Sequence, residues 1–280
     1  MSKVTEKHYV QTKLGTIAVQ IRNCQSDKIP VIFLHGVYFD HHLWDIQAGN
    51  IKDRTVITLD MPLHGESRDI KKSDWTLNDC GDMLVELLDA LQIRKVMAIG
   101  HSWGSMTILR AAHKYPEHFE HVGLCNMPFK AVTQKQKLTF WLQHLMLIFR
   151  NFYTKQAAKT LFGKKSLKEY PTLFTRLSLS MSVLTNKEVR QIDQKVILEA
   201  EDASSLIQNL QVKAIALKGR EDYVPTPPKI ETIMVDGGHI SPLEDPQKVL
   251  DLIKMLDNQQ KPAIQSSSIG CPHELVILPK

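Results

Sequence analysis

Hydrophobic residues along the chain fall into short continuous runs that alternate with longer periodic stretches. Four runs, at residues 30–34, 54–59, 96–99 and 121–124, are short and mostly apolar, which predicts central strands buried on both faces. Residues 77–91 instead repeat apolar positions every three or four residues, which predicts a helix with one buried face. Strands that alternate with helices indicate a mostly parallel sheet with helices on both faces.

The two ends of this pattern extend the predicted sheet. Residues 7–12 and 16–21 flank a Leu-Gly pair, which predicts an antiparallel hairpin at one edge of the sheet. Apolar runs return at 212–217 and 230–235, and residues 246–256 have the spacing of a closing helix. The sheet is therefore expected to continue after a long interruption.

That interruption follows the sixth predicted strand. The sequence there is helical in pattern, basic and apolar, so we predict a helical cap at residues 128–200 inserted into a core formed by residues 1–127 and 201–257. Residues 258–280 are mixed in Gln, Ser, Pro and Gly, which predicts a flexible tail. The chain is thus expected to hold one α/β domain with a cap.

Composition limits the classes of protein to which the chain belongs. The 280 residues are 43% hydrophobic, enough for one large core. The four cysteines are scattered without C-x-x-C spacing, the amino-terminal sequence lacks an apolar signal core, and no run reaches the roughly 18 apolar residues of a membrane span. We therefore expect a soluble protein in a reducing, cytoplasmic compartment.

The net charge of +5 is spread unevenly. Residues 127–168 hold nine Lys or Arg and no Asp or Glu, so the predicted cap is strongly basic. Within it, residues 138–153 have apolar side chains around nearly the whole circumference of a helix, which would have to be covered on most sides by packing on the core. Alternatively, part of this surface, including Trp141, lines an acyl-binding pocket, and flanking lysines such as Lys164 and Lys165 face an anionic membrane surface or an anionic substrate. We expect no nucleic-acid partner.

One pentapeptide carries the strongest chemical signal. Gly100-His101-Ser102-Trp103-Gly104 follows a predicted strand and opens a helix-like segment. A serine there lies on a sharp strand-to-helix turn, and glycines two residues away on each side avoid collisions with the next strand or helix. Serine is a weak nucleophile by itself, so the hypothesis requires a base and an acid elsewhere in the chain.

Both groups follow strands near the end of the chain. Asp222 lies on a loop after the run at 212–217, and His239 comes just after the run at 230–235. The carboxyl ends of parallel strands meet at one edge of a sheet, where α/β proteins place their ligand-binding groups, so we expect both to converge on Ser102. His239 would remove the serine proton and Asp222 would orient the imidazole. Other acids for this role are Asp236 and Glu221.

An oxyanion would need hydrogen-bond donors close to the serine. The backbone amide of Trp103 is one candidate, and Val37, in the loop after the strand that ends at residue 34, is the second. Gly36 would let the backbone approach closely, and we assign it and His35, with Trp141, to substrate binding. His41-His42 beside Asp40 lacks the spacing of a zinc site, and no metal or other cofactor is expected.

Taken together, five motifs resemble those of the α/β-hydrolase family. They occur in the family's order over most of residues 30–255: His35-Gly36, residues 60–67, the turn around Ser102, residues 219–225, and Gly238-His239. The resemblance implies a serine, acid and histidine in that order, a mostly parallel sheet with helices on both faces and, after the sixth strand, a helical cap.

The sequence departs from the family pattern in two places. The interval between Asp222 and His239 is short, and Thr226-Pro227-Pro228 leaves little room for the helix usually found there, so an irregular last crossover is expected. Some members place the acid after the sixth strand, where this chain has Cys125-Asn126, and neither residue is a carboxylate.

The resemblance implies hydrolysis of a carboxylic ester, a lactone or a thioester through an acyl-serine, and the apolar residues of the predicted cap favour a small substrate with an apolar acyl group. A carbon–carbon bond hydrolase, an aminopeptidase and a cofactor-free lyase use the same fold and remain alternatives. A ligand receptor that keeps the three residues but turns over slowly is a further alternative.

Overall fold

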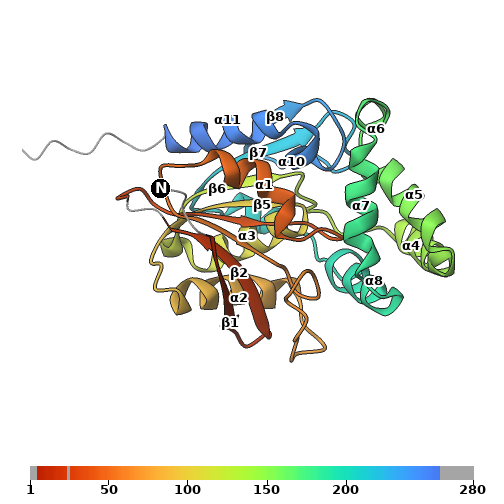
Figure 1. The fold of residues 1–280 in the computed structure, drawn as a ribbon, viewed down its shortest axis with the longest axis horizontal. Coiled ribbons are helices and arrows are strands. Elements are labelled where there is room, and N and C mark those ends of the chain that lie inside the picture. Colours follow the sequence, from red (N-terminus) through yellow and green to blue (C-terminus); the bar gives the residue numbers. More distant parts are fainter. Residues whose placement is uncertain (1–4, 24–25, 259–280) are drawn as a thin grey trace, which may run out of the picture.

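The computed structural model describes residues 5–23 and 26–258, and its centre is an eight-stranded sheet. The strand order is β1-β2-β4-β3-β5-β6-β7-β8. The amino-terminal hairpin β1–β2 is antiparallel and joins β4 antiparallel, whereas all later neighbours pair parallel. The predicted hairpin and mostly parallel sheet are confirmed (Figure 1). The strands are β1 (Thr5–Gln11), β2 (Thr16–Arg22), β3 (Val31–Leu34), β4 (Val56–Leu59), β5 (Val96–His101), β6 (Phe119–Cys125), β7 (Lys213–Gly219) and β8 (Glu231–Val235).

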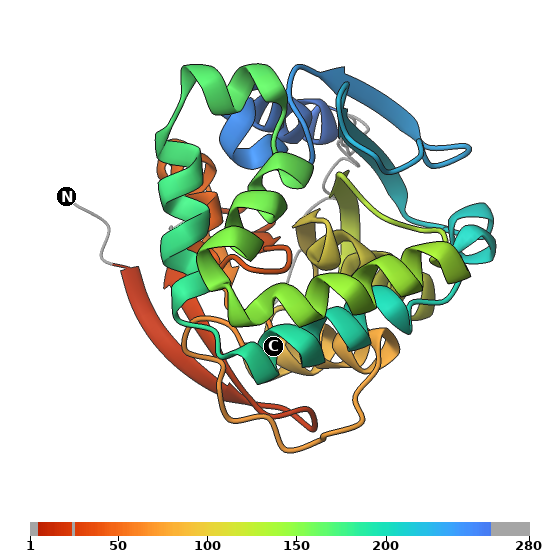
Figure 2. The ribbon, with the colours of Figure 1, turned by 90° about the vertical axis from the view of Figure 1, so that its right-hand side faces the viewer.

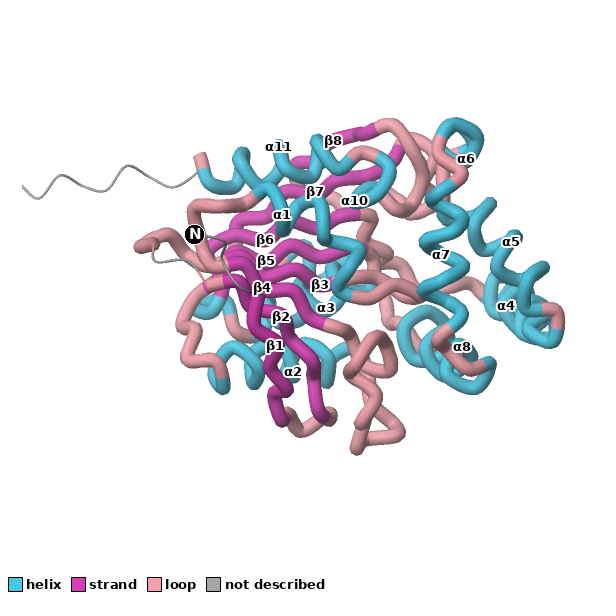
Figure 3. Tube along the Cα trace, in the orientation of Figure 1, coloured by secondary structure: helices cyan, strands magenta, loops and turns pink. Residues whose placement is uncertain are grey.

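Helices cover both faces of this sheet. On one side α2 packs on α3, and on the other α1 packs on α11, so every side chain of β3, β4 and β5 is buried (Figures 1 and 3). The predicted helix at 77–91 is α2, which starts at a capping box formed by Thr76 and Asp79. The helices of these layers are α1 (Asp45–Asn50), α2 (Leu77–Ala90), α3 (Trp103–Lys114), α10 (Ser241–Glu244) and α11 (Pro246–Asp257), with 3₁₀ turns at His41–Trp44 and Pro116–His118.

Between β6 and β7 the chain forms a group of helices at one end of the sheet. Figure 2 looks onto that end and shows them in green and teal. We call residues 128–200, which hold most of these helices, the cap, and their division from the core as a separate domain stays a prediction. The predicted tail lies outside the described residues from residue 259 onward. The helices are α4 (Gln134–Leu145), α5 (Arg150–Leu161), α6 (Lys164–Glu169), α7 (Thr172–Ser182), α8 (Asn186–Asp193) and α9 (Ser204–Gln208), with a 3₁₀ turn at Met146–Ile148 and a π turn at Gln194–Leu198.

The prediction of one covered helix at 138–153 is wrong in two respects. The segment breaks after Leu145 into a 3₁₀ turn, and Phe149 leaves the helical region with ψ of 65° before α5 begins. Most of its large apolar side chains are exposed, Ile148 at 71%. The prediction assumed one helix inside the core, where apolar residues on every side have to be packed against other elements. The break removes that requirement.

The last crossover is irregular, as the sequence predicts. Residues 220–230 connect β7 to β8 without a helix. Among the described residues, no helix combines the length and the apolar content needed to cross a membrane.

Candidate active site

Ser102 lies on a strained turn between β5 and α3. Its φ of 50° and ψ of −110° fall in a region that costs a non-glycine residue about 1–3 kcal/mol. The end of β6 and the first turn of α3 hold it there, because its amide donates to the carbonyl of Cys125 at 2.9 Å and its carbonyl accepts from the amide of Met106. The turn directs the serine side chain away from the sheet and into a cavity.

The flanking glycines make this turn sterically feasible. A Cβ atom on Gly104 would lie 2.2 Å from the carbonyl oxygen of Leu34, and one on Gly100 would lie 2.4 Å from the amide of Ser105. Both obstacles are backbone atoms, which cannot rotate away. Only glycine therefore allows the helix to start this close to β3.

The structure brings together the three residues that the sequence singles out. The Nε2 atom of His239 lies 2.9 Å from Oγ of Ser102, and its Nδ1 atom lies 2.9 Å from Oδ1 of Asp222. All three side chains are buried. An ionised Asp222 accepts a hydrogen bond from the Nδ1–H of His239, which leaves Nε2 free to accept the serine proton.

Asp222 is held in its ionised form by further donors. Burial raises its pKa, but the neighbouring His239 and hydrogen bonds from Nδ2 of Asn126 (2.8 Å) and the amide of Val224 (3.2 Å) outweigh burial, so the net pKa is lowered. Asn126 has a φ of 50° and occupies the place after the sixth strand where the sequence offers no carboxylate. Its amide steadies the acid instead of replacing it, a role that sequence reasoning missed.

The loop that carries His239 is fixed from several sides. The His239 amide donates to the carbonyl of Leu161 at the end of α5, and its carbonyl accepts a hydrogen bond from Nε2 of His101 at 2.7 Å. The ring of Tyr223 stacks on the imidazole at 4.9 Å between centroids. The carboxylate of Glu244 accepts the amides of Gly238 and Ile240 in the loop and also that of Gly163 in the cap segment. No motif in the sequence marks His101 or Glu244 for this role.

The two amides predicted as oxyanion donors belong to the loop after β3 and to the start of α3. Trp103 is the first residue of α3, so its amide has no acceptor within the helix. Val37 lines the same cavity as Ser102, and the neighbouring amides are occupied, since Tyr38 donates to His64 and Gly104 donates to His35. Their role as oxyanion donors stays a prediction.

Three residues assigned to substrate binding lie elsewhere. His35 is fully buried, where its Nε2 accepts the amide of Met61, and Gly36 packs against His101 and Ser102. Trp141 is 58% exposed on α4. None of the three is among the residues that line the cavity, and their assignment to substrate binding stays a prediction. Trp141 lies on the face of α4 opposite to the cavity-lining residues Gln136, Phe140 and Gln143.

The cavity next to Ser102 has a volume of about 690 Å³. Its wall is formed by loops of the core and by the cap. Among the described residues that line it, Lys130 is the only Lys or Arg, and there is no Asp or Glu. The remaining lining is mostly aliphatic and aromatic, with a few amides and hydroxyls. Contributions from the cap include Phe140, Met146, Phe152, Tyr153, Ala157, Leu161, Val196 and Ile197.

A buried polar cluster ties the cap to the loop that carries Val37. The fully buried carboxylate of Asp193 accepts hydrogen bonds from the hydroxyls of Tyr38 (2.6 Å) and Tyr153 (3.2 Å), and His144 Nε2 lies 2.8 Å from it. The carbonyl of Tyr38 also accepts the hydroxyl of Ser180 in α7. The position of the predicted oxyanion loop therefore depends on four cap residues, which no sequence motif reveals.

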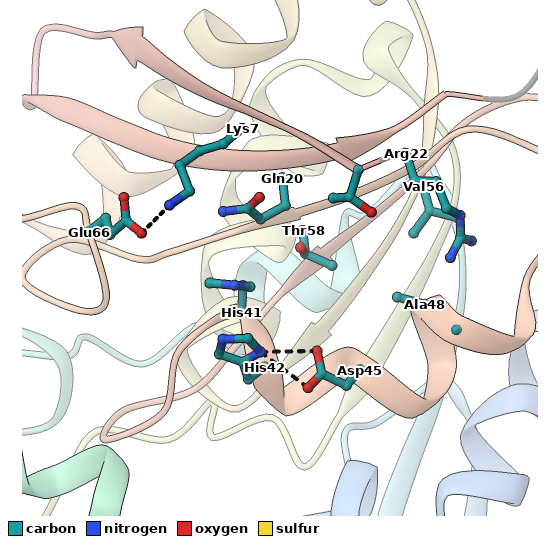
Figure 4. Close-up of a pocket in the computed structure, with 12 residues that line it drawn as sticks. Lys7, Gln20, Arg22, His41, His42, Asp45, Ala48, Val56, Thr58 and Glu66 are labelled. Carbon is teal, nitrogen blue, oxygen red and sulfur yellow. Dashed lines mark hydrogen bonds and ion pairs between the residues drawn. The ribbon is translucent and has the colours of Figure 1, made fainter. Parts of the chain in front are cut away.

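A second hollow, of about 540 Å³, lies over β1, β2 and β4 (Figure 4). Several of its polar groups already have partners, because Lys7 pairs with Glu66 and His42 pairs with Asp45. Arg22 donates to the carbonyl of Ile51. His41 bonds to Asp60 at 2.8 Å. In the part of the chain that the structure describes, no three His, Cys, Asp or Glu side chains are grouped so as to hold a metal ion.

Comparison with known proteins places the chain in a family. A model of the alpha/beta hydrolase fold matches residues 29–168. The chain belongs to the α/β-hydrolase fold family. The same fold occurs in a thermophilic esterase from Thermogutta terrifontis, with a TM-score of 0.77 at 20% identity over 90% of this chain and 98% of that one.

Curated relatives within this fold have different named activities. The chain is 30% identical over 120 residues to 3-oxoadipate enol-lactonase 1 of Acinetobacter baylyi, and 23% identical over 156 residues to epoxide hydrolase 1 of Caenorhabditis elegans. The matches cover 42% and 55% of this chain, but only 44% and 36% of those proteins. These matches support the hydrolase fold but do not identify the reaction.

The elbow geometry predicts a large difference between two glycine substitutions. Gly104→Ala should lower the free energy of unfolding by more than about 3 kcal/mol, because the new methyl group meets the backbone of β3. Gly49→Ala, in α1 with no atom within 4 Å of the new Cβ, should be neutral or stabilising by up to about 1 kcal/mol. Urea denaturation of both variants checks this, and equal stabilities would contradict it.

Buried histidines near the site predict a loss of stability in mild acid. Burial, chiefly, lowers the pKa of His35 and His101 to about 3 and that of His64 to about 4, from an ordinary 6.5. The unfolded chain therefore takes up these protons at a higher pH than the folded chain does. The free energy of unfolding is highest above about pH 6.5 and falls as the pH drops toward the pKa values of the folded state. At pH 5 the loss is about 2 kcal/mol for each histidine.

Urea denaturation at about pH 7 and pH 5 measures this loss. His64→Gln should reduce this loss by the share of one histidine, because one fewer proton is taken up on unfolding. The variant should still fold, because the glutamine side-chain oxygen can accept the hydrogen bond from the Tyr38 amide. His42→Gln, at an exposed position, should leave the loss unchanged. A free energy of unfolding that is the same at both pH values would show that these histidines are not buried in the neutral form.

Proposed function

We propose that the chain hydrolyses carboxylic esters with neutral, apolar acyl groups through an acyl-enzyme on Ser102. The observation that carries this proposal is the position of the Ser102–His239–Asp222 chain of hydrogen bonds in the wall of a large, mostly apolar cavity. Ester hydrolysis requires a nucleophile, a base and space for the acyl group, and this cavity offers all three side by side.

The reaction follows from the hydrogen bonds. Ser102 Oγ attacks the ester carbonyl carbon while Nε2 of His239 takes the hydroxyl proton, and the carbonyl oxygen becomes an oxyanion near the amides of Val37 and Trp103. The resulting imidazolium is stabilised by Asp222 and gives its proton to the departing alkoxide. A water molecule then repeats these steps on the acyl-serine, which releases the carboxylic acid and restores the serine hydroxyl.

The cavity wall favours neutral acyl groups over charged substrates. Binding of a free amino terminus by an aminopeptidase requires a carboxylate, and the described lining has neither Asp nor Glu. Lactones and thioesters present the same electrophilic carbonyl to Ser102, and the named activity of the Acinetobacter relative is lactone hydrolysis. We therefore place esters first and lactones second among the substrates to be tried.

Removal of the nucleophile should abolish turnover. Ser102→Ala is expected to lower kcat by about 10⁶-fold and to prevent labelling by a fluorophosphonate probe. Ser105→Ala is the matched control, because this nearby buried hydroxyl bonds only to the carbonyl of Cys125 and its loss should cost about 1 kcal/mol of stability. Rates are measured with p-nitrophenyl esters.

Two outcomes would contradict the proposal. Retention of more than a few per cent of the activity by Ser102→Ala would assign the reaction to another group. Strong labelling of Ser102 with no turnover of any ester or lactone would instead favour a receptor that keeps an activated serine.

The depth of the cavity should set the preferred acyl length. Ala157 lines it from α5, so Ala157→Phe should lower kcat/KM for long-chain p-nitrophenyl esters by about tenfold or more while leaving the acetate little changed. Lys159→Phe adds the same ring to the exposed side of the same helix and should leave the chain-length profile unchanged. A profile that does not shift in Ala157→Phe would show that acyl groups bind elsewhere.

A further inference from the structure

The two cap helices that line the cavity also carry large apolar side chains that are exposed. On α4 the exposed residues Leu138, Trp141, Leu142 and Leu145 recur at helical spacing and form one stripe. The stripe continues after the break in the exposed residues Ile148, Phe149 and Phe152. We call these seven residues the outer stripe.

This concentration is unusual for the molecule. Half of the large hydrophobic residues that are exposed in the described chain belong to the outer stripe, and the others are spread over several elements. Single exposed apolar residues are ordinary, whereas a contiguous set marks a surface that binds something.

The cavity uses the opposite face of the same helix. Gln136, Phe140 and Gln143 of α4 line the cavity, and the helical repeat places them across the helix from the outer stripe. Phe152 belongs to both surfaces, because it lines the cavity and is 47% exposed. The wall of the cavity therefore reaches the molecular surface at the outer stripe.

The segment that carries the outer stripe has charges of one sign, and a carboxylate near it, Glu199, comes from the end of the neighbouring π turn and interacts with Lys137. Residues 134–161 contain four lysines and one arginine and no carboxylate. Lys135 and Lys137 are exposed at the start of the stripe on α4, and Lys155 and Lys159 follow Phe152 at helical spacing on α5. Arg150 is committed to the cap, where it bonds to the carbonyls of Met181 and Leu184.

We propose that the outer stripe docks on a membrane surface that contains anionic phospholipid. The apolar side chains would enter the headgroup region, and the four lysines would lie over lipid phosphates. A second copy of the chain fits less well, because two basic faces would then be brought together. Docked in this way, α4 would have lipid on one side and the acyl cavity on the other, so an apolar substrate could pass between them at Phe152.

Trp141 makes the docking directly measurable. The chain has four tryptophans, and the other three, Trp44, Trp75 and Trp103, are fully buried. A blue shift of tryptophan emission on addition of vesicles therefore reports on Trp141 alone. We expect this shift, with co-sedimentation, for vesicles of phosphatidylcholine and phosphatidylserine, and weakening of both by salt.

Paired variants separate the outer stripe from general surface effects. Leu142→Ser with Ile148→Ser should weaken vesicle binding by more than about tenfold, and Lys135→Gln with Lys137→Gln by about 25-fold. The matched controls, Ile46→Ser with Met234→Ser and Lys248→Gln with Lys254→Gln, alter exposed residues of the core and should bind as the unmodified chain does. Trp141→Phe should still co-sediment while the emission shift disappears.

Several results would overturn this inference. One is that the chain fails to bind the anionic vesicles, and another is that it binds vesicles of phosphatidylcholine alone equally well. A third is that the core control variants lose as much binding as the variants of the outer stripe. A dimer in light scattering that the stripe variants convert to a monomer would show that a second copy covers the surface. Shielding of Trp141 that is relieved by removal of residues 259–280 would assign the stripe to the chain's own terminus. Ser102→Ala should bind vesicles normally, so failure of docking and failure of the ester proposal are distinguishable.

Discussion

The close approach of α3 to β3 is the constraint on which the rest of the site depends. Gly104 lies against the backbone of Leu34, Gly100 lies against the start of the helix, and between them Ser102 is held at a φ of 50°. Because the strain is confined to one turn and the flanking strands are completely buried, the core can hold a conformation that an isolated peptide would not adopt. The serine thus reaches the cavity, and the ends of β7 and β8 bring the acid and the histidine to the same edge of the sheet.

A second feature is the dependence of this edge on the cap. The amide of His239 donates to α5, Glu244 accepts amides from both the histidine loop and the cap segment, and Asp193 anchors Tyr38 beside Val37. The cap is therefore part of the machinery that positions the candidate catalytic groups, as well as a wall of the cavity. Changes in the cap are expected to affect both the rate of reaction and the choice of substrate.

Local patterns were sufficient to predict the sheet and the convergence of Ser102, His239 and Asp222 at one of its edges. The buried strands are continuous apolar runs, and the glycines around Ser102 indicate a turn that only glycine permits. The strands and this turn can therefore be predicted from a few neighbouring residues. The cap was predicted less well. The apolar residues at 138–153 have the composition of a buried helix, and whether Trp141 faces the cavity or the solvent depends on how α4 lies against segments far away in the sequence. Asn126, Glu244 and Asp193 act through contacts of the same long-range kind.

The central claim is that Ser102 becomes acylated by an ester with the help of His239. Rapid mixing with p-nitrophenyl butyrate, an acid quench and mass spectrometry of the digested protein test it most directly. The account predicts one butyryl group on the peptide that contains Ser102, and none in His239→Gln. Butyrylation of a different residue, or equal acylation of Ser102 in His239→Gln, would contradict it.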